Sequence, residues 1–423
     1  MFEHIGNIIK INRIKQDISQ EQLSRGICSI SYLSKLENGK IIGSVDMIQP
    51  LLKELNLEID LEEVNQEMQI IKENLNNLNY KLFSGKLNSS DELELDLLAN
   101  RISKYSNVDI NAYYLLVKLR DATIKRSLQS AERIINQIKS IYDQISGYNK
   151  SLFCIYTAHK LLIENKHQEA KIKLTEVLSQ ENVSLERWLK GYLYYLMSLC
   201  ENHDYRISSC LLYVEKALII FQGEYYLSRC MDCLMIKGIN YLRLNELEKA
   251  EESFAICENL LLKEPDTGRQ LKVLHNRALI LQKRGRNEEA ISYLLNTVHM
   301  KQELNKANSE SLNFSIYVLA KTYYKLHNIE ECRKWLSQIE YNPAPSTIHR
   351  ELAIMNFLCK AEEETEMLGH TAFLIKELKN EKKWNEAAEF CFLIGQKYHS
   401  LKQYKKASNH FKSAYLAQSK LAT

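Results

Sequence analysis

Short polar side chains and one lysine gather between residues 29 and 38, where the sequence reads SISYLSKLEN. Hydroxyl, amide and ammonium groups of this kind hydrogen-bond to phosphates and to the edges of bases. The spacing favours a short helix that begins after Ser29, because a serine hydroxyl accepts backbone N–H bonds at a helix start. A helix presented in this way fits the major groove of DNA, with its N-terminal residues at the base edges.

The residues around this segment predict the small bundle that would hold it. A first amphipathic helix has Ile5, Ile8, Ile9 and Ile14 on one side and Lys10, Arg13 and Lys15 on the other. Ser19 and Gln20 cap a short second helix over residues 21–25, and Gly26 makes the turn that comes after it. A fourth helix over residues 45–55 completes the bundle with further apolar side chains.

The run QEQL followed by SISYLSKLENG resembles the helix-turn-helix of the phage-repressor superfamily, also called Cro/cI or XRE. The resemblance implies that Gln20 contacts a phosphate and that Ser29, Ser31, Tyr32 and Lys35 meet bases. Glu37-Asn38-Gly39 matches the Glu-x-Gly element that ends the third helix in that superfamily. We expect Asn38 to contact DNA as well. The proline that usually follows this element is absent here.

The small positive charge of this segment indicates that two copies of it bind DNA together. Residues 1–40 contain six basic and four acidic side chains, a net charge of +2. One such unit makes few phosphate contacts and binds DNA weakly. We therefore expect a homodimer or higher oligomer on a two-part duplex site.

Composition predicts an almost entirely α-helical protein in the cytoplasm. The chain has only 13 Gly and 4 Pro among 423 residues, and no alternating strand pattern of useful length. It has neither a signal peptide nor an apolar run long enough to span a membrane. Its ten cysteines, including the isolated pair Cys230 and Cys233, fit buried thiols in a reducing compartment better than a zinc or redox site.

Beyond residue 110 the sequence repeats itself. Gly238, Tyr241, Ala250 and Phe254 occupy the small, aromatic, small and aromatic positions of a tetratricopeptide (TPR) repeat, at offsets 0, 3, 12 and 16. Related copies begin at Ala158, Ala278, Ala320 and Gly395. The period near 40 predicts seven to nine helical pairs stacked in a right-handed superhelix. We therefore expect an all-α protein in which residues 1–65 are the helix-turn-helix domain with its linker helix, and residues 66–423 are the TPR array.

The concave face of such an array is the expected ligand site. An asparagine can pair both the N–H and the C=O of a peptide unit, and a lysine can bind a carboxylate. A groove with an apolar floor and cationic and amide groups therefore suits a short peptide, although each asparagine could instead cap a helix or face solvent. The expected peptide contacts are Met235, Ile239, Asn240, Lys272, His275, Asn276, Asn313, Tyr317 and Lys321.

No catalytic pattern accompanies these features. The chain contains no phosphate-binding glycine loop, no HExxH, no GxSxG and no paired-cysteine metal motif. We therefore expect no catalytic residues, no metal and no cofactor, and a protein that is not an enzyme.

A repressor-type helix-turn-helix domain followed by a TPR array of this length resembles the RNPP family of peptide-sensing regulators. The resemblance is strongest to its NprR-type members. The resemblance implies a regulator in a Gram-positive bacterium that binds double-stranded DNA and a short signalling peptide in quorum sensing. An alternative is the activity of Rap-type members, which bind a response regulator and promote its loss of phosphate. Residues 61–110, with Gln66 or Gln69 positioning a water, would then supply the contact, although a plain linker helix is the simpler interpretation.

Overall fold

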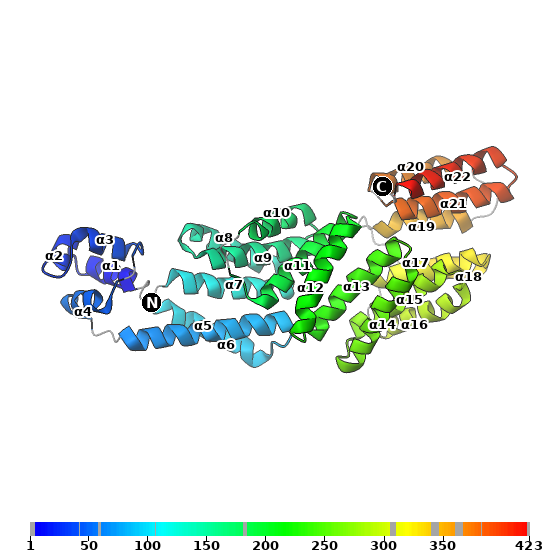
Figure 1. The fold of residues 1–423 in the computed structure, drawn as a ribbon. Coiled ribbons are helices and arrows are strands. Elements are labelled where there is room, and N and C mark those ends of the chain that lie inside the picture. The colour runs from blue at the N-terminus through cyan, green and yellow to red at the C-terminus, as the bar shows by residue number, and fades with distance from the viewer. Residues whose placement is uncertain are drawn as a thin grey trace. The chain divides into compact units, whose positions relative to one another are not determined.

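The computed structural model describes residues 5–41, 43–57, 61–105, 107–180, 184–304, 310–339, 347–359, 367–381 and 383–420. Within these ranges every regular element is a helix, which confirms the all-α prediction (Figure 1). None of the described helices combines the length and the hydropathy that a membrane span requires.

Four short helices form the head: α1 (Ile5–Lys15), α2 (Gln20–Ser24), α3 (Ile30–Glu37) and α4 (Val45–Glu54). Their buried side chains form one apolar core, contributed by all four helices: Ile5, Ile9, Leu23, Leu33, Leu36, Ile48, Leu51, Leu52 and Leu55. Ile14 does not join it, because it lies near the end of α1 and is 55% exposed. The expected apolar face of the first helix therefore stops at Ile9.

Local caps set the ends of the two central head helices. The Ser19 hydroxyl accepts from the Gln22 N–H and the Gln22 side chain accepts from the Ser19 N–H, which is a complete capping box. The Ser29 hydroxyl accepts from the Tyr32 N–H at the start of α3. Gly26 and Gly39 come after the two helices with φ of +77° and +65°, a conformation that glycine adopts without strain.

The helix after the head is longer than expected. α5 (Leu61–Ser84) runs without interruption through the predicted boundary between residues 65 and 66. Its side chains bond to the next two helices, through Glu67 to Arg101 Nε at 2.8 Å and through Asn76 to the Tyr113 hydroxyl at 2.7 Å. Since α5 packs with the array, we propose a domain boundary before Leu61.

From α5 onward the described residues form nine successive helix pairs, whose helices are labelled in Figure 1. After α5 their bounds are α6 (Ser89–Ser103), α7 (Val108–Ile124), α8 (Leu128–Ser140), α9 (Gly147–Ile163), α10 (His167–Leu178), α11 (Arg187–His203), α12 (Ile207–Gly223), α13 (Leu227–Arg243), α14 (Leu247–Lys263), α15 (Thr267–Lys283), α16 (Asn287–Glu303), α17 (Glu310–Lys325), α18 (Ile329–Leu336), α19 (Thr347–Cys359), α20 (Met367–Asn380), α21 (Trp384–Ser400) and α22 (Tyr404–Ser419). A short 3-10 helix, η1 (Tyr142–Gln144), precedes α9.

The turns inside the pairs repeat with the predicted period. Their middle residue has a positive φ of 56° to 76°, at Arg126, Asn165, Tyr205, Asn245, Gly285, His327 and Lys402. The residue after it donates its backbone N–H back to the end of the first helix, as Lys166 does to the Leu161 oxygen at 2.9 Å and Glu246 to the Tyr241 oxygen at 2.9 Å. The first five of these turns succeed one another at intervals of 39 or 40 residues.

The small anchor residues lie where two helices approach closely. A Cβ at Gly238 would stand 2.6 Å from the Phe254 ring, and one at Gly395 would stand 2.6 Å from the Phe411 ring. The repeat hidden in the sequence has Ser198 at the anchor position, and Ser198 is fully buried. Its serine explains why a search for glycine or alanine at that position misses the copy.

The chain divides into two compact units. The first contains residues 1–204 and 219–226, and the second contains residues 205–218 and 227–423. The head and the helices from α5 to α11 therefore belong to the first unit, and the helices from α13 to α22 belong to the second.

Candidate functional sites

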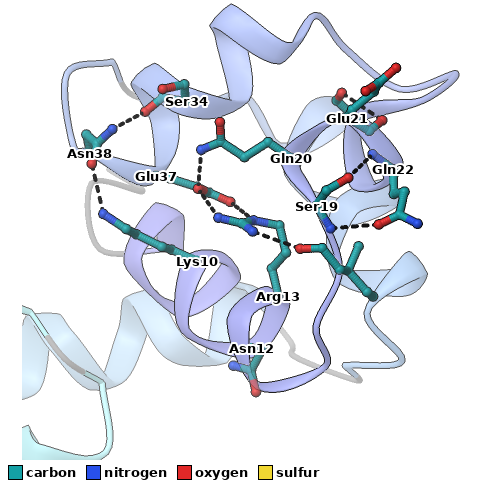
Figure 2. Close-up of polar contacts among 12 residues, drawn as sticks. Lys10, Asn12, Arg13, Ser19, Gln20, Glu21, Gln22, Ser34, Glu37 and Asn38 are labelled. Carbon is teal, nitrogen blue, oxygen red and sulfur yellow. Dashed lines mark hydrogen bonds and ion pairs between the residues drawn. The ribbon is translucent and has the colours of Figure 1, made fainter.

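A buried carboxylate joins the first three helices of the head (Figure 2). Glu37, at the last position of α3, is 3% exposed. Arg13 of α1 donates to it twice, from Nε to Oε1 at 2.6 Å and from Nη2 to Oε2 at 2.9 Å, while Gln20 at the start of α2 donates from Nε2 to Oε2 at 2.6 Å. The hydrogen bond to Glu37 raises the pKa of Arg13. This three-residue contact, the Glu37 clamp, fixes α3 relative to α1 and α2.

Close backbone contact reinforces the clamp. A Cβ at Gly6 of α1 would stand only 1.9 Å from the Leu36 carbonyl oxygen of α3. No side chain fits in that space, so α1 and α3 can meet at this distance only because residue 6 is glycine. The two helices therefore form a rigid base beneath the exposed side of α3.

The segment from Ser29 to Lys35 presents several polar side chains to solvent. Ser29, Ser31 and Lys35 are exposed, whereas Tyr32 is half-buried against the head core. Ile30 is 47% exposed on the same short segment, and an apolar side chain there can contact a thymine methyl group. The sequence interpretation missed Ile30, because its spacing to Leu33 is that of a core residue.

Two expected DNA contacts are engaged within the head. The Gln20 amide is directed to the Glu37 carboxylate, so its phosphate contact stays a proposal. Asn38 is exposed, and it accepts from Lys10 Nζ at 2.9 Å and donates to the Ser34 carbonyl at 2.8 Å. Lys10 thereby stands beside the end of α3, which adds a positive charge that the sequence interpretation did not assign to this surface.

The expected peptide contacts differ widely in exposure. Lys272 is exposed, Ile239 and Asn313 are half-buried, and Met235 and Tyr317 are 6% and 2% exposed. Asn240 is fully buried, and its Nδ2 donates to the Ile236 carbonyl at 2.9 Å and toward Cys210 Sγ at 3.4 Å, so its peptide contact stays a proposal. Its amide stabilises the interior between α12 and α13.

A hydrogen-bonded chain orients His275 of α15. Lys301 Nζ of α16 donates to the Ser315 hydroxyl of α17 at 2.8 Å, and Ser315 Oγ lies 3.2 Å from His275 Nδ1. Burial, with the nearby Lys301 charge, lowers the pKa of His275 to about 3. Since a lysine only donates, the Ser315 hydrogen is available to Nδ1, and the neutral ring then has its hydrogen on Nε2.

The far side of this imidazole has no partner. His275 Nε2 is buried and makes no hydrogen bond within the described structure. The adjacent Asn276 is 9% exposed and donates its Nδ2 to the Lys272 carbonyl at 2.7 Å. An unpaired N–H beside an amide is an arrangement that can hold a peptide carbonyl.

Lys321 does not offer a free positive charge. Its Nζ pairs with Glu389 Oε2 at 2.7 Å, and Lys325 pairs with Glu389 Oε1 at 2.6 Å. The two ammonium groups lower the pKa of Glu389 to about 2, against the opposing effect of burial. A carboxylate contact from Lys321 would therefore compete with Glu389, which the sequence interpretation did not anticipate because 68 residues separate the partners.

A buried arginine in the first unit was also missed. Arg120 of α7 is 1% exposed and lies under aromatic rings, with its guanidinium carbon 5.0 Å from the Tyr156 centroid and 4.9 Å from the Tyr192 centroid. Its Nη1 donates to Asn79 Oδ1 at 3.1 Å, but Nε and Nη2 have no partner in the described structure. The residues around it, Asn79, Tyr156 and Tyr192, come from α5, α9 and α11, so no local pattern in α7 indicates a site there.

Cys230 and Cys233 lie as expected in the interior of α13. They are 3% and 0% exposed and are free thiols. Burial raises the pKa of both, to about 11 for Cys230. The burial of both thiols on one helix agrees with the interpretation of this pair as apolar packing residues.

Comparison with known proteins gives the same two-part arrangement. A helix-turn-helix family model matches residues 9–61. The transcriptional activator NprA of Geobacillus stearothermophilus is 24% identical over 412 residues, which cover 93% of this chain and 98% of that protein. The relative thus matches the head and the array together, in the same order. This likeness over nearly the whole chain agrees with the resemblance to the RNPP family.

Two solved structures share the fold of this chain. A Rap protein complexed with competence and sporulation factor has a TM-score of 0.65 at 14% identity, covering 84% of this chain and 99% of that one. NprR in complex with its cognate peptide NprX has a TM-score of 0.58 at 19% identity, covering 82% of this chain and 99% of that one. Both likenesses extend over the helical array, which establishes the TPR-type fold.

Proposed function

We propose that this protein is a transcriptional regulator that binds duplex DNA through α3 and responds to a short peptide bound in its TPR array. The proposal of DNA binding rests on the Glu37 clamp, which holds α3 with Ser29, Ser31 and Lys35 facing solvent. A rigid support with exposed donors is what reading of base edges requires. The protein acts by binding rather than by catalysis, and we place it in the cytoplasm, where its DNA is.

Two heads act together in this proposal. One head brings few positive charges to the DNA, and the salt-dependent phosphate contacts supply much of the affinity of such domains. A dimer doubles these contacts and fixes the distance between two half-sites. The two recognition helices would then read sites about one helical turn, or a multiple of it, apart.

The peptide site is proposed at His275 and Asn276 of α15. His275 Nε2 is buried without a partner, and a peptide carbonyl is the acceptor that would satisfy it. The solved NprR complex holds a peptide named NprX in a protein of the same fold. Short peptides of that kind, read in quorum sensing, are therefore the ligand class that we propose for this chain.

Linkage joins the two sites. A peptide that binds one arrangement of the repeats better than another shifts the population toward that arrangement. Because the heads are attached to the array, their separation changes with it, and the affinity for a two-part DNA site changes in turn. The coupling is reciprocal, so bound DNA changes the peptide affinity by the same factor.

The test begins with the peptide. The protein is purified gently from a Gram-positive host, and peptides released by acid are identified by mass spectrometry. A synthetic copy is then titrated into the protein with and without its selected DNA site. We expect the DNA dissociation constant to change with peptide, and an unchanged constant at saturating peptide would refute the linkage.

A second activity is favoured by the surface of α6. Leu93 and Leu97 are 67% and 65% exposed one helical turn apart, which is an apolar pair suited to a protein partner. Gln66 and Gln69 of α5 are exposed, and Gln69 donates to Glu73 at 2.7 Å. We propose a response regulator as the alternative partner of this region. Phosphate loss from a purified response regulator, with and without this protein, separates this activity from DNA binding.

A further inference from the structure

Two buried cysteines from different helix pairs meet in the second unit. Cys332 of α18 and Cys359, the last residue of α19, have their Sγ atoms 3.1 Å apart. Both are free thiols, 0% and 4% exposed. A disulfide bond is about 2.0 Å long, so a shift of about 1 Å separates this contact from a covalent bond.

Positive groups surround the end of α19. Arg333 donates from Nε to the Cys359 carbonyl oxygen at 3.0 Å, and its Nη2 donates to the same oxygen. Lys397 of α21 donates to the Phe357 and Leu358 carbonyls at 3.0 and 2.9 Å. Both cations thus lie at the helix terminus where Cys359 stands.

These neighbours distinguish the two thiols. The hydrogen bond with Cys332, followed by the charges of Arg333 and Lys397, lowers the pKa of Cys359. For Cys332, the same bond and burial raise the pKa. The thiolate is the reactive form of cysteine, and Cys359 is the thiol of this pair whose pKa is lowered.

The other buried cysteines lack this combination. Burial raises the pKa of Cys154 to about 11 and of Cys257 to about 12, and their Sγ atoms donate to Glu176 Oε2 at 3.5 Å and to the Met231 carbonyl at 3.4 Å. Cys230 and Cys233, although close in sequence, also have raised pKa values. The Cys332–Cys359 contact therefore differs in kind from simple packing of small apolar side chains.

We propose that Cys332 and Cys359 form a reversible disulfide when the protein meets a peroxide, making this contact an oxidation site in the TPR array. The Cys359 thiolate attacks a peroxide oxygen, the O–O bond breaks, and the sulfur becomes a sulfenic acid as water leaves. Cys332 then attacks that sulfur, the S–O bond breaks, and a second water leaves. In sum, two thiols lose two electrons and two protons, and hydrogen peroxide is reduced to two waters. A cellular dithiol reverses the reaction by exchange.

The disulfide would connect consecutive helix pairs. It links α18, the second helix of its pair, to α19, the first helix of the next, across 27 positions of sequence. A cross-link of this kind restricts the unfolded chain and also limits movement between the pairs. Oxidation would therefore stiffen the part of the array that the proposed peptide response requires to move.

The test uses the full chain and hydrogen peroxide. Protein treated with increasing peroxide is alkylated, digested and mapped by mass spectrometry, with the partly exposed Cys28 as an internal reference. We expect a linked peptide pair containing Cys332 and Cys359, two mass units below the sum of the free peptides, at doses that leave Cys154 and Cys257 reduced. Dithiothreitol should restore both thiols and reverse an accompanying rise in melting temperature.

Two variants test the separate roles of Cys359 and Cys332 in forming the disulfide. In Cys332→Ser, Cys359 should accumulate as a sulfenic acid that dimedone labels, because the second thiol is missing. The matched control, Cys230→Ser, should leave the cross-link unchanged. The proposal is overturned if Cys332 and Cys359 remain alkylatable in the wild-type protein at doses that oxidise Cys28, or if they oxidise without becoming linked.

Discussion

The Arg13 guanidinium of α1 meets the Glu37 carboxylate of α3 edge to edge, with N–O distances of 2.6 and 2.9 Å. Glu37→Gln should weaken the head, since it removes the negative charge from a side chain that is fully buried and leaves the Arg13 charge unmatched. We expect a loss of about 1–3 kcal/mol, in line with removal of a buried hydrogen-bond partner. Hydrogen exchange of the α1 and α3 amides in the full chain measures it.

A matched control separates the effect of Glu37→Gln from the general effect of removing a negative charge. Glu21→Gln removes the same charge from an exposed residue of α2 and should leave exchange in α1 and α3 unchanged. Equal exchange in the two variants would show that the Glu37 clamp does not stabilise the head.

In the array the size of the anchor residue matches the size of the side chain 16 positions later, which we call the size rule. A paired substitution tests it. A glycine anchor has phenylalanine 16 positions later, as in Gly238–Phe254 and Gly395–Phe411, whereas an alanine anchor has leucine, as in Ala278–Leu294. Gly238→Ala alone should destabilise the second unit by roughly 1–3 kcal/mol, because its Cβ would overlap the Phe254 ring.

Adding Phe254→Leu should recover part of that loss by making room for the methyl group. Urea unfolding of the two single variants and the double variant gives the coupling energy directly. Strict additivity of the two effects would contradict the size rule.

Acid should destabilise the second unit partly through His275. Its pKa is lowered to about 3 in the folded protein, below its ordinary 6.5, so the unfolded chain binds more protons between these values. The contribution of His275 is therefore fully present above pH 6.5 and is lost progressively as the pH falls toward 3. His275→Gln should flatten the decline of melting temperature between pH 6.5 and 4.

The exposed His299 supplies the control, since its side chain is 72% exposed. His299→Gln should follow the wild-type pH profile. A His275→Gln profile identical to the wild type would mean that the imidazole is not held neutral by burial.

Asn276→Ala tests the proposed peptide site. If the amide pairs with a bound peptide backbone, its loss should weaken peptide binding roughly 5- to 150-fold, the equivalent of about 1–3 kcal/mol. Calorimetry with the identified peptide measures this, and DNA binding without peptide should be unaffected. Unchanged peptide affinity would move the site to other repeats.

The sequence predicted the parts of this molecule whose signals are local. Caps at Ser19 and Ser29 and the glycine after α3 depend on neighbours within a few positions, and the structure places the helix ends accordingly. The repeat period was equally accessible, because each turn is a local structure that recurs. Ser198 shows the limit, since a serine can be as small as the position requires without resembling the pattern.

Features that depend on distant partners were not predictable. Asn240 had the spacing of a groove residue, but its burial results from how α12 packs on α13. The match of Lys321 with Glu389 arises because α17 and α21 come together in the fold. Ile14 likewise had a core-like position in its helix and found no partner there.

The most direct test of the central claim is selection of duplex DNA from a randomised pool by the full-length protein. Ser31→Ala with Lys35→Ala is the informative variant, because both side chains are exposed and neither belongs to the head core, and Lys53→Ala on α4 is a control of equal charge. We predict that the wild type and Lys53→Ala enrich one two-part motif and that the double variant loses it while remaining folded. Enrichment of the same motif by the double variant, or of no motif by the wild type, would contradict the assignment of α3 as the DNA-reading helix.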